Sequence, residues 1–389
     1  MKIAILSSYY PLIGGAEVFA QEVAEYVATK VGEADVITLH PDKSLSKFEL
    51  INNVTVHRIG VSRIGYLRFL GGFLRLLWHV LKLNKARNYD LIHSVQDGIF
   101  CYVGTCVKRL TGRPHLITIQ GGNISAGFKN DLSGKILCKL QKWSFKNADW
   151  VHVISRSLAQ ESERLGAKNI AVLPNGIDSR LFKPMDKEKI RRKYSLSPKE
   201  KIVVSVARLA PVKGVDCLIR AIGLLVENIS ALRLIVIGDG KQRVELEQLI
   251  DQLHLNNKVQ LLGFIPHEQI LEYLNMADVF VLPSRHEGLG IALIEAMACG
   301  IPVIGSNVDG IVDLIEHEKN GILFPPNDEK ELARALDKLL QDENLRRAFI
   351  EEGLEKVKEN FLWSSILPKI EDIYTELVQD KKEAKAFKS

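Results

Sequence analysis

The segment VFVLPSRHEGLGIALIEAMACG, residues 279–300, decides the fold class. Its first four residues are all apolar, which is typical of a short strand buried on both faces. Two glycines, Gly288 and Gly290, then mark a loop, and an apolar helical pattern follows to residue 298. A strand, a glycine-containing loop and a helix in this order predict one half of a βαβ unit.

The same alternation extends through the chain in two series. Strand-like runs separated by helical stretches lie at 2–7, 34–39, 54–59, 90–94, 115–119, 150–154 and 170–173, and again at 201–206, 232–237, 259–262 and 302–304. This pattern predicts an α/β protein with parallel sheets covered by helices on both faces. Residues 174–200, which contain Pro174, Gly176, Pro184 and a charged run, predict a linker or hinge between the two series.

Length and charge agree with two unlike domains. A chain of 389 residues is too long for one ordinary core. Residues 1–185 hold 24 Lys and Arg against 14 Asp and Glu, whereas the remainder holds 28 against 33. The positive half fits either an anionic partner, such as a phosphate-bearing ligand, a membrane or a nucleic acid, or a solvated basic surface.

The compartment is predicted from cysteines and apolar runs. Five cysteines with no C-x-x-C pair indicate neither a disulfide framework nor a zinc cluster, and favour a reducing environment. The N-terminal apolar run at 3–6 is too short for a signal peptide, and no apolar run approaches the roughly 18 residues of a membrane-spanning helix. We therefore expect a cytoplasmic protein.

The stretch from Arg63 to Arg87 mixes leucines and aromatic residues with regularly spaced basic residues. A basic amphipathic helix of this kind lies on an anionic membrane. It can equally pack its apolar face on a sheet, and both can hold because the apolar positions outnumber one face. The first interpretation predicts peripheral attachment to the inner face of the membrane.

Several loops that follow predicted strands are candidate ligand sites, because open α/β sheets bind ligands at the carboxyl ends of their strands. Gly14 and Gly15 precede a helix, where they indicate either a phosphate contact or a plain turn. Arg208 and Lys213 stand between a strand and a helix that starts near Gly214. Two cations there suit a diphosphate leaving group, although two solvated surface cations are the alternative.

Two acidic residues complete the candidate set. Glu287 lies in the loop after strand 279–282, and Glu295 lies about one and a half turns into the next helix. One carboxylate is placed for sugar hydroxyls and the other for a ribose diol; a capping Glu287 and a solvated Glu295 are the alternative. The sequence Gly238-Asp239-Gly240 has Arg243 where a dinucleotide fingerprint needs its third glycine, so it predicts only a tight turn near a ligand.

Taken in order, these blocks resemble those of family-four retaining glycosyltransferases of the GT-B fold over nearly the whole chain. The matching blocks are Gly14-Gly15, Leu173-Pro174-Asn175-Gly176-Ile177-Asp178, Arg208, Lys213-Gly214, Gly238-Asp239-Gly240, the pair Glu287 and Glu295, and Gly321-Ile322-Leu323-Phe324-Pro325. The resemblance implies two Rossmann-like domains whose parallel sheets face a central cleft. The expected domains are an acceptor domain at 1–183, joined by a C-terminal helix at about 362–378, a donor domain at 184–361 and a flexible tail at 379–389.

The resemblance also implies roles for single residues. Arg208 and Lys213 would hold the donor diphosphate, Glu287 the donor sugar and Glu295 the ribose hydroxyls. The expected donor site further includes Gly14, Gly15, Gly238, Phe264, Gly288, Leu289 and Gly290. A hexosyltransferase with a UDP- or GDP-sugar donor and a saccharide or lipid-linked acceptor is implied. We expect no nucleic-acid partner. We also expect no metal cofactor, since the chain has no D-x-D, HExxH or Walker A motif.

Two positions depart from the family pattern. Many members have a histidine after the strand at 115–119, where this chain has Gln120, which can donate a hydrogen bond to a sugar hydroxyl but cannot act as an acid or base. His93 is a weaker candidate for that role, and a structural histidine is the alternative. The loop that in many members reads Gly-Gly followed by a glutamate reads Asp309-Gly310-Ile311-Val312-Asp313 here, so its carboxylate is shortened.

The absence of an obvious base motivates a mechanistic hypothesis. Transfer would retain the anomeric configuration, with Arg208, Lys213, Glu287 and Gln120 assisting and the donor phosphate taking the acceptor proton. A sugar-nucleotide epimerase on the same fold and a non-catalytic nucleotide-sugar-binding protein are the alternatives. The sequence names neither the donor sugar and its base nor the acceptor.

Overall fold

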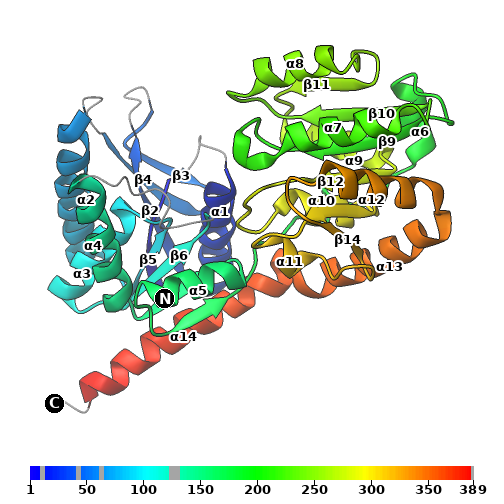
Figure 1. Cartoon of the computed structure of the whole chain (residues 1–389). Coiled ribbons are helices and arrows are strands. Elements are labelled where there is room, and N and C mark those ends of the chain that lie inside the picture. The colour runs from blue at the N-terminus through cyan, green and yellow to red at the C-terminus, as the bar shows by residue number, and fades with distance from the viewer. Residues whose placement is uncertain (9–13, 41–44, 61–64, 122–131, 387–389) are drawn as a thin grey trace. The chain divides into compact units, whose positions relative to one another are not determined.

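The computed structural model describes residues 1–8, 14–40, 45–60, 65–121 and 132–386; side chains at 65–70, 132, 133, 382 and 384–386 are left out of the description (Figure 1). The chain divides into two compact units. Unit 1 comprises Met1–Asn175 and Trp363–Ser389, and unit 2 comprises Gly176–Leu362. The sequence pattern placed the corresponding boundaries at 183 and 361.

Unit 1 is built on an eight-stranded sheet in its described residues, with strand order β3-β4-β2-β1-β5-β6-β7-β8. Its strands are β1 (Lys2–Leu6), β2 (Glu33–His40), β3 (Phe48–Ile51), β4 (Val54–Gly60), β5 (Leu91–Val95), β6 (His115–Ile119), β7 (Trp150–Val153) and β8 (Ile170–Val172). All neighbours pair in parallel except β3, which pairs antiparallel with β4. The chain leaves β1 toward β2 and β4 on one side and then returns to β5 on the other, which is the doubly wound order of Rossmann-like folds.

Helices cover both faces of this sheet. They are α1 (Gly15–Tyr26) with a π-helical extension at Val27–Val31, α2 (Gly65–Arg87), α3 (Ile99–Thr111), α4 (Leu132–Asn147), α5 (Arg156–Arg164) and α14 (Trp363–Ala386). The alternation of side chains along β1 explains the layers: Ile3 and Ile5 share a core with α1 and α14, whereas Ala4 and Leu6 share one with α2 and α3. A strand buried on both faces must be apolar throughout, as the run at 3–6 is.

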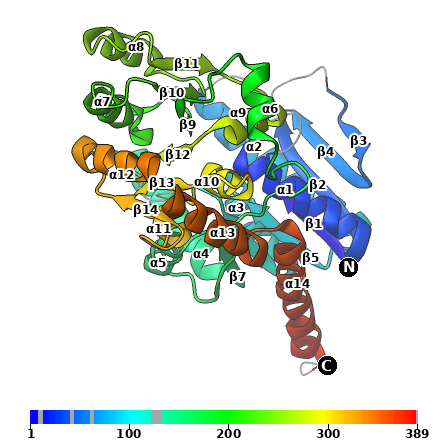
Figure 2. The same cartoon turned by 90° about the vertical axis from the view of Figure 1, so that its right-hand side faces the viewer.

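Unit 2 repeats the architecture with a six-stranded sheet in its described residues, ordered β11-β10-β9-β12-β13-β14 and parallel throughout. Its strands are β9 (Lys201–Val206), β10 (Leu232–Ile237), β11 (Val259–Gly263), β12 (Val279–Leu282), β13 (Val303–Ser306) and β14 (Gly321–Phe324). Its helices are α6 (Lys187–Lys193), a 3₁₀ turn at Pro211–Lys213, α7 (Val215–Leu225), α8 (Arg243–Gln252), α9 (His267–Met276), α10 (Ile291–Ala298), α11 (Ile311–Leu314), α12 (Glu329–Gln341) and α13 (Glu343–Asn360). On one face, α7 packs beside α12 (Figure 2). The predicted pair of Rossmann-like α/β units is confirmed.

The structure differs from the sequence pattern at three segments. The charged run expected in the linker forms helix α6, because Asp186 caps it by accepting from the Lys189 backbone N–H at 3.0 Å. Arg191 of that helix is buried and donates to the Met276 carbonyl at 2.8 Å. The edge strand β3 was not predicted. Helix α14 continues to Ala386, beyond the expected start of the tail at 379, because lysine, glutamate and alanine there all favour helix.

Candidate functional site

The topology of unit 2 brings the predicted charged loops to one place. Strands β9 and β12 are neighbours at the centre of the sheet, where the order of strands reverses. Arg208 and Lys213 follow β9, and Glu287 follows β12. Because both strands run in the same direction, these loops emerge at the same edge, at the switch point where doubly wound sheets bind ligands.

Lys213 and Glu287 form an ion pair at this edge. The Lys213 Nζ lies 2.6 Å from the Glu287 Oε2, and the side chains are 20% and 13% exposed. Ser284 donates its hydroxyl to the same oxygen at 3.0 Å. An ammonium group has three donors, so Lys213 keeps donors for a second anion while it holds the carboxylate.

Arg208 is the contrasting cation. Its side chain is exposed, and within the described residues no hydrogen-bond or ion-pair partner is found for it. Leu209, the next residue, is fully buried, so the backbone that carries Arg208 is anchored in the core. An anchored but unpaired guanidinium presents its donors to an anion arriving from solvent.

Glycines allow these loops to touch. Gly214 has a φ of 64°, and a Cβ there would collide with the Pro283 carbonyl oxygen. Gly238 has a φ of 131°, and a Cβ there would likewise collide with the Ala207 carbonyl oxygen. A Cβ on Gly310 would collide with the Gly288 carbonyl oxygen. The loops after the central strands are therefore packed backbone to backbone, which fixes the side chains between them.

We expect Gly214→Ala to disrupt this edge of unit 2. The added Cβ meets a carbonyl oxygen of another loop, and the left-handed φ adds strain. A loss of about 2 kcal/mol or more in the free energy of unfolding is expected, measured by urea denaturation. Gly223→Ala in α7 is the control, because its nearest neighbours are leucine side chains at 3.7 and 3.8 Å. Equal stability of the two variants would contradict the packing argument.

Arg285 ties the same two loops together. Its backbone N–H donates to the Val212 carbonyl at 2.7 Å, and its guanidinium pairs with Asp216 at 2.7 Å. The sequence pattern had singled out neither Arg285 nor Asp216. Their pairing shows that a conspicuous arginine in the loop beside Glu287 serves the loop's conformation.

Glu295 is held by a histidine that sequence reasoning missed. Glu295 lies in α10 with a side chain only 7% exposed, and its Oε1 lies 2.8 Å from His267 Nε2 at the start of α9. This hydrogen bond raises the pKa of His267 above its usual value. Phe182 covers the imidazole, with ring centroids 4.9 Å apart. Glu295 keeps its second carboxylate oxygen for another donor.

The loop after β11 carries Phe264, whose side chain is 81% exposed. Gly263 precedes it with a φ of 77°, and its carbonyl accepts from the Gly238 N–H at 2.8 Å. Phe264 is therefore displayed on a loop bound to the end of β10. An exposed aromatic face on a fixed backbone suits stacking with a planar ring.

The start of α10 offers backbone donors. Gly290 is its N-cap residue, in the left-handed region with a φ of 91°. Among the described residues, no backbone or side-chain acceptor is found for the N–H groups of Gly288, Leu289 and Gly290. Together with the helix dipole, such groups favour an anion. Next to them, Asp309 lies 3.1 Å from His286.

In unit 1, Gly14 and Gly15 stand at the start of α1, as predicted, and residues 9–13 before them lie outside the described residues. Gly14 is extended, with a φ of −165°, so its backbone does not require glycine. Three residues on, Glu17 accepts from the Gln96 carboxamide at 3.2 Å, and Gln96 in turn accepts from Ser8 at 3.3 Å. This polar cluster at the ends of β1 and β5 was not predicted.

Gln120 follows β6 and is held by one end of its carboxamide. Its Oε1 accepts from Asn175 at 2.6 Å, while its Nε2 is buried without a partner. The Oδ1 of Asn175 is also buried and unpartnered. A free donor beside a free acceptor matches a hydroxyl group, which both accepts and donates. By contrast, His93 is fully buried between Tyr374 and Thr118. It is therefore the structural histidine that the sequence analysis gave as the alternative.

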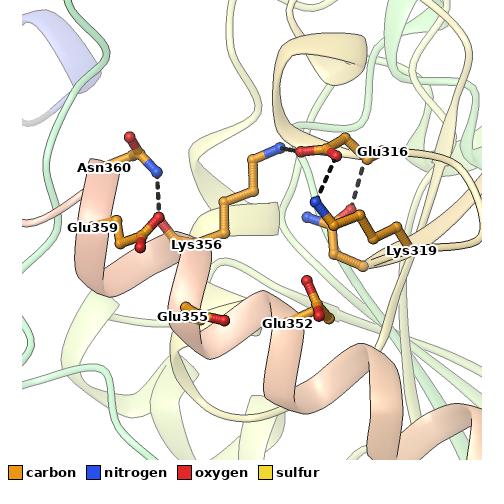
Figure 3. Close-up of a pocket in the computed structure, with 8 residues that line it drawn as sticks. Glu316, Lys319, Glu352, Glu355, Lys356, Glu359 and Asn360 are labelled. Atoms are coloured by element: carbon orange, nitrogen blue, oxygen red, sulfur yellow. Dashed lines mark hydrogen bonds and ion pairs between the residues drawn. The ribbon is translucent and has the colours of Figure 1, made fainter.

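A separate pocket of unit 2 does not belong to this site. It is lined by Glu316, Lys319, Asn320, Glu352, Glu355, Lys356, Glu359 and Asn360 (Figure 3). Residues 316–320 precede β14 and so lie at the amino ends of the parallel strands, opposite the edge that carries Glu287. Within the described residues, no three His, Cys, Asp or Glu side chains gather as a metal site, and no helix is long and apolar enough to span a bilayer.

Comparisons with known proteins show the family of the chain. The family model "Glycosyltransferase Family 4" matches residues 13–181, and "Glycosyl transferases group 1" matches residues 186–356. An uncharacterized glycosyltransferase of Methanocaldococcus jannaschii is 31% identical over 96% of this chain and 98% of its own length. The chain belongs to glycosyltransferase family 4. This glycosyltransferase is also 29% identical to the N-acetyl-alpha-D-glucosaminyl L-malate synthase of Bacillus anthracis, over 99% of this chain and 100% of the synthase.

A solved structure supports the GT-B fold of the glycosyltransferase. The Anabaena protein HepE, crystallised with UDP and glucose, has a TM-score of 0.79 and 24% identity, covering 96% of this chain and 99% of its own. The sequence placed Arg208, Lys213 and Glu287 in loops after strands and Glu295 in the following helix, where the structure of the glycosyltransferase has them. It missed His267, Arg285 and Asn175, since their partners lie 28 to 69 residues away along the chain, and it also missed Ser284, whose partner Glu287 is only three residues away.

Proposed function

We propose that this glycosyltransferase transfers a hexosyl group from a nucleoside-diphosphate sugar to a saccharide or lipid-linked acceptor, with retention of the anomeric configuration. The observation that supports this most is the Lys213–Glu287 ion pair beside the unpaired Arg208 at the β9–β12 switch point. Cations compensate the charge that grows on a departing diphosphate, and a lysine-bound carboxylate accepts sugar hydroxyls. The UDP and glucose in HepE are consistent with a uridine diphosphate donor.

The other site residues are assigned by the same chemistry. Glu295, with one oxygen on His267, accepts from the ribose diol, and Phe264 stands over the base. The N–H groups of Gly288, Leu289 and Gly290 complement the phosphates, with Gly238 forming the turn beside them. Because Arg208 and Lys213 supply the positive charge, we propose that the reaction needs no metal.

Unit 1 would supply the acceptor-facing groups. The donor–acceptor pair of Gln120 and Asn175 suits a sugar hydroxyl, and the start of α1 at Gly14 and Gly15 suits phosphate or sugar. Gln120 has no acid–base role, so the departing phosphate oxygen takes the acceptor proton as the glycosidic bond breaks. This front-face route leaves the new bond in the original anomeric configuration. We further propose that the protein works in the cytoplasm.

Donor identity is tested by thermal shift with UDP-, GDP- and ADP-sugars. A ligand that binds only the native state raises the apparent Tm, by an amount that grows with its concentration over Kd. We expect one base to stabilise the protein, and Arg208→Ala to lose that stabilisation. No shift with any nucleotide sugar would contradict the proposal.

The stereochemical outcome is tested by NMR of the product formed with the donor so identified. We expect an anomeric coupling constant that matches the donor's configuration. An inverted product would refute the front-face route while leaving the transfer activity itself intact. Incubation with donor alone is the control, because an epimerase would convert the donor without an acceptor.

A further inference from the structure

We propose that the exposed face of helices α2, α3 and α4 docks on an anionic lipid surface. This α2–α4 face consists of the exposed side chains of the three helices, which lie side by side on one side of unit 1 (Figure 1). The inference deepens the proposed function, because it rests on the lipid-linked form of the acceptor. The sequence predicted a membrane contact through the single stretch from Arg63 to Arg87, of which Arg63 lies outside the described residues. The proposal assigns the contact instead to a surface formed by three helices.

Charge on this face has one sign. The three helices have 23, 13 and 16 residues, and they contain no aspartate or glutamate. They carry eleven lysines and arginines, five in α2, two in α3 and four in α4, of which Arg87 pairs with Asp35 and Lys108 with Asp149. Basic and acidic residues normally alternate on solvated helices, where they form i,i+4 pairs. Their separation here leaves a field that attracts anions.

The lysines of α4 form one outward stripe. Lys135, Lys139, Lys142 and Lys146 recur at helical spacing, and all four are exposed. Within the part of the chain that the structure describes, none of them has an ion-pair partner. The buried side of the same helix packs through Phe145. The stripe therefore contributes charge to the surface and nothing to ion pairing within unit 1.

Helix α2 presents a second stripe that begins apolar and ends basic. Leu74 and Trp78 are 55% and 57% exposed, and Lys82 and Lys85 continue the same side of the helix. The opposite side is buried through Leu76 and Val80. Lys82 Nζ lies 5.1 Å from the Trp78 ring centroid. An exposed tryptophan beside lysines is the arrangement of interfacial helices, whose aromatic ring enters the headgroup region.

Apolar side chains also project from the other two helices. Leu110 of α3 is 67% exposed and Ile136 of α4 is 50% exposed. Large aliphatic side chains gain nothing from contact with the phosphates of a nucleic acid, whereas they lose water contact in a bilayer interface. The combination of unpaired lysines with exposed Trp, Leu and Ile therefore favours a lipid surface.

Vesicle flotation of the full chain tests the proposal. We expect the protein to float with vesicles of phosphatidylcholine mixed with phosphatidylglycerol and to stay behind with phosphatidylcholine alone. Added salt should release part of the bound protein, since it screens the lysines but not the apolar contacts. Failure to bind the anionic vesicles would overturn the proposal, as would tighter binding to a single-stranded oligonucleotide than to those vesicles.

Variants with matched controls locate the surface. Lys139→Gln with Lys142→Gln should lower the partition coefficient about 25-fold, because each basic residue near an anionic membrane contributes about fivefold. The control is Lys330→Gln with Lys358→Gln, two exposed lysines of α12 and α13 in unit 2. Trp78→Ala should weaken binding even in high salt, with Leu224→Ala of α7, 49% exposed, as its control. Equal losses in variants and controls would refute the α2–α4 face.

The surface and the proposed function can fail separately. The Lys139 and Lys142 variant should keep the thermal shift with the nucleotide sugar, because it leaves every residue of the donor site in place. A protein that floats but binds no nucleotide sugar would refute the function and keep the surface. A protein that binds the nucleotide sugar but not the vesicles would refute the surface and keep the function.

Discussion

Replacing Arg208 with alanine is expected to lower kcat by about 10²- to 10³-fold without changing stability. Losing one donor that stabilises developing negative charge typically has this effect on the rate. Arg208 is exposed and has no partner among the described residues, so its removal should change the free energy of unfolding by less than about 0.5 kcal/mol. Initial rates with the identified donor and urea denaturation measure the two effects.

Lys213→Ala is expected to differ from Arg208→Ala in stability. Its rate should fall by a similar factor, about 10²- to 10³-fold. It also leaves Glu287, only 13% exposed, with Ser284 as its remaining partner, so stability should fall by about 1–3 kcal/mol. Removing both members, as Lys213→Ala with Glu287→Ala, should restore part of the stability but none of the activity.

Arg220→Ala is the matched control for both cations. Arg220 is an exposed arginine in α7, and no described residue pairs with it. The Arg220→Ala substitution changes the charge of unit 2 as Arg208→Ala does. Arg220, however, lies in the body of the helix and not in a loop at the end of a strand. Retained turnover in Arg208→Ala, or equal loss in Arg220→Ala, would contradict the assignment of the donor site.

Mild acid is expected to destabilise unit 1 before unit 2. Three histidines of unit 1, His93, His115 and His152, are almost completely buried. Burial lowers the pKa of His115 to about 3 and of His152 to about 4, and holds that of His93 well below its usual range. Each is neutral in the folded state and would lose its hydration if charged there.

The sign follows from proton binding. Below a pH of about 6.5, the pKa of histidine in the unfolded chain, these histidines bind protons in the unfolded state but stay neutral in the folded state. The free energy of unfolding therefore falls as the pH falls. Each histidine contributes a slope approaching about 1.4 kcal/mol per pH unit until its folded pKa is reached. Together they remove about 4–6 kcal/mol by pH 5, a large part of a typical domain's stability.

Hydrogen exchange at pH 7.5 and pH 5 measures this prediction region by region. Peptides of β5, β6 and β7 should lose protection at pH 5, while those of β9 and β12 keep theirs. Unit 2 has the opposite tendency, because the raised pKa of His267 makes its contact with Glu295 favourable at low pH and weaker as the pH rises through that value. Loss of protection in unit 2 first, or in neither unit, would refute the role of the buried histidines.

The buried histidines also show why the sequence left His93 open. A histidine in a strand gives the same local sequence pattern whether its side chain faces a ligand or the core. The structure places His93 Nδ1 at 2.7 Å from the Tyr374 hydroxyl, a residue 281 positions away. Helix α14 thereby closes the core of unit 1 over β5, and no local pattern around His93 could indicate it.

The sequence by itself determined the two α/β units and the sheet edge that carries the candidate site residues. Apolar runs, helical spacing and strand-end glycines are local properties, and parallel strands place all their carboxyl ends together, so Arg208, Lys213 and Glu287 could be assigned to one edge. The tertiary structure alone decided which polar groups pair: Lys213 with Glu287, Glu295 with His267, Arg285 with Asp216 and Gln120 with Asn175. These hydrogen bonds join groups 28 to 74 residues apart, and each needs its angle and its distance to be right to within a few tenths of an ångström. Only the packed core fixes that geometry.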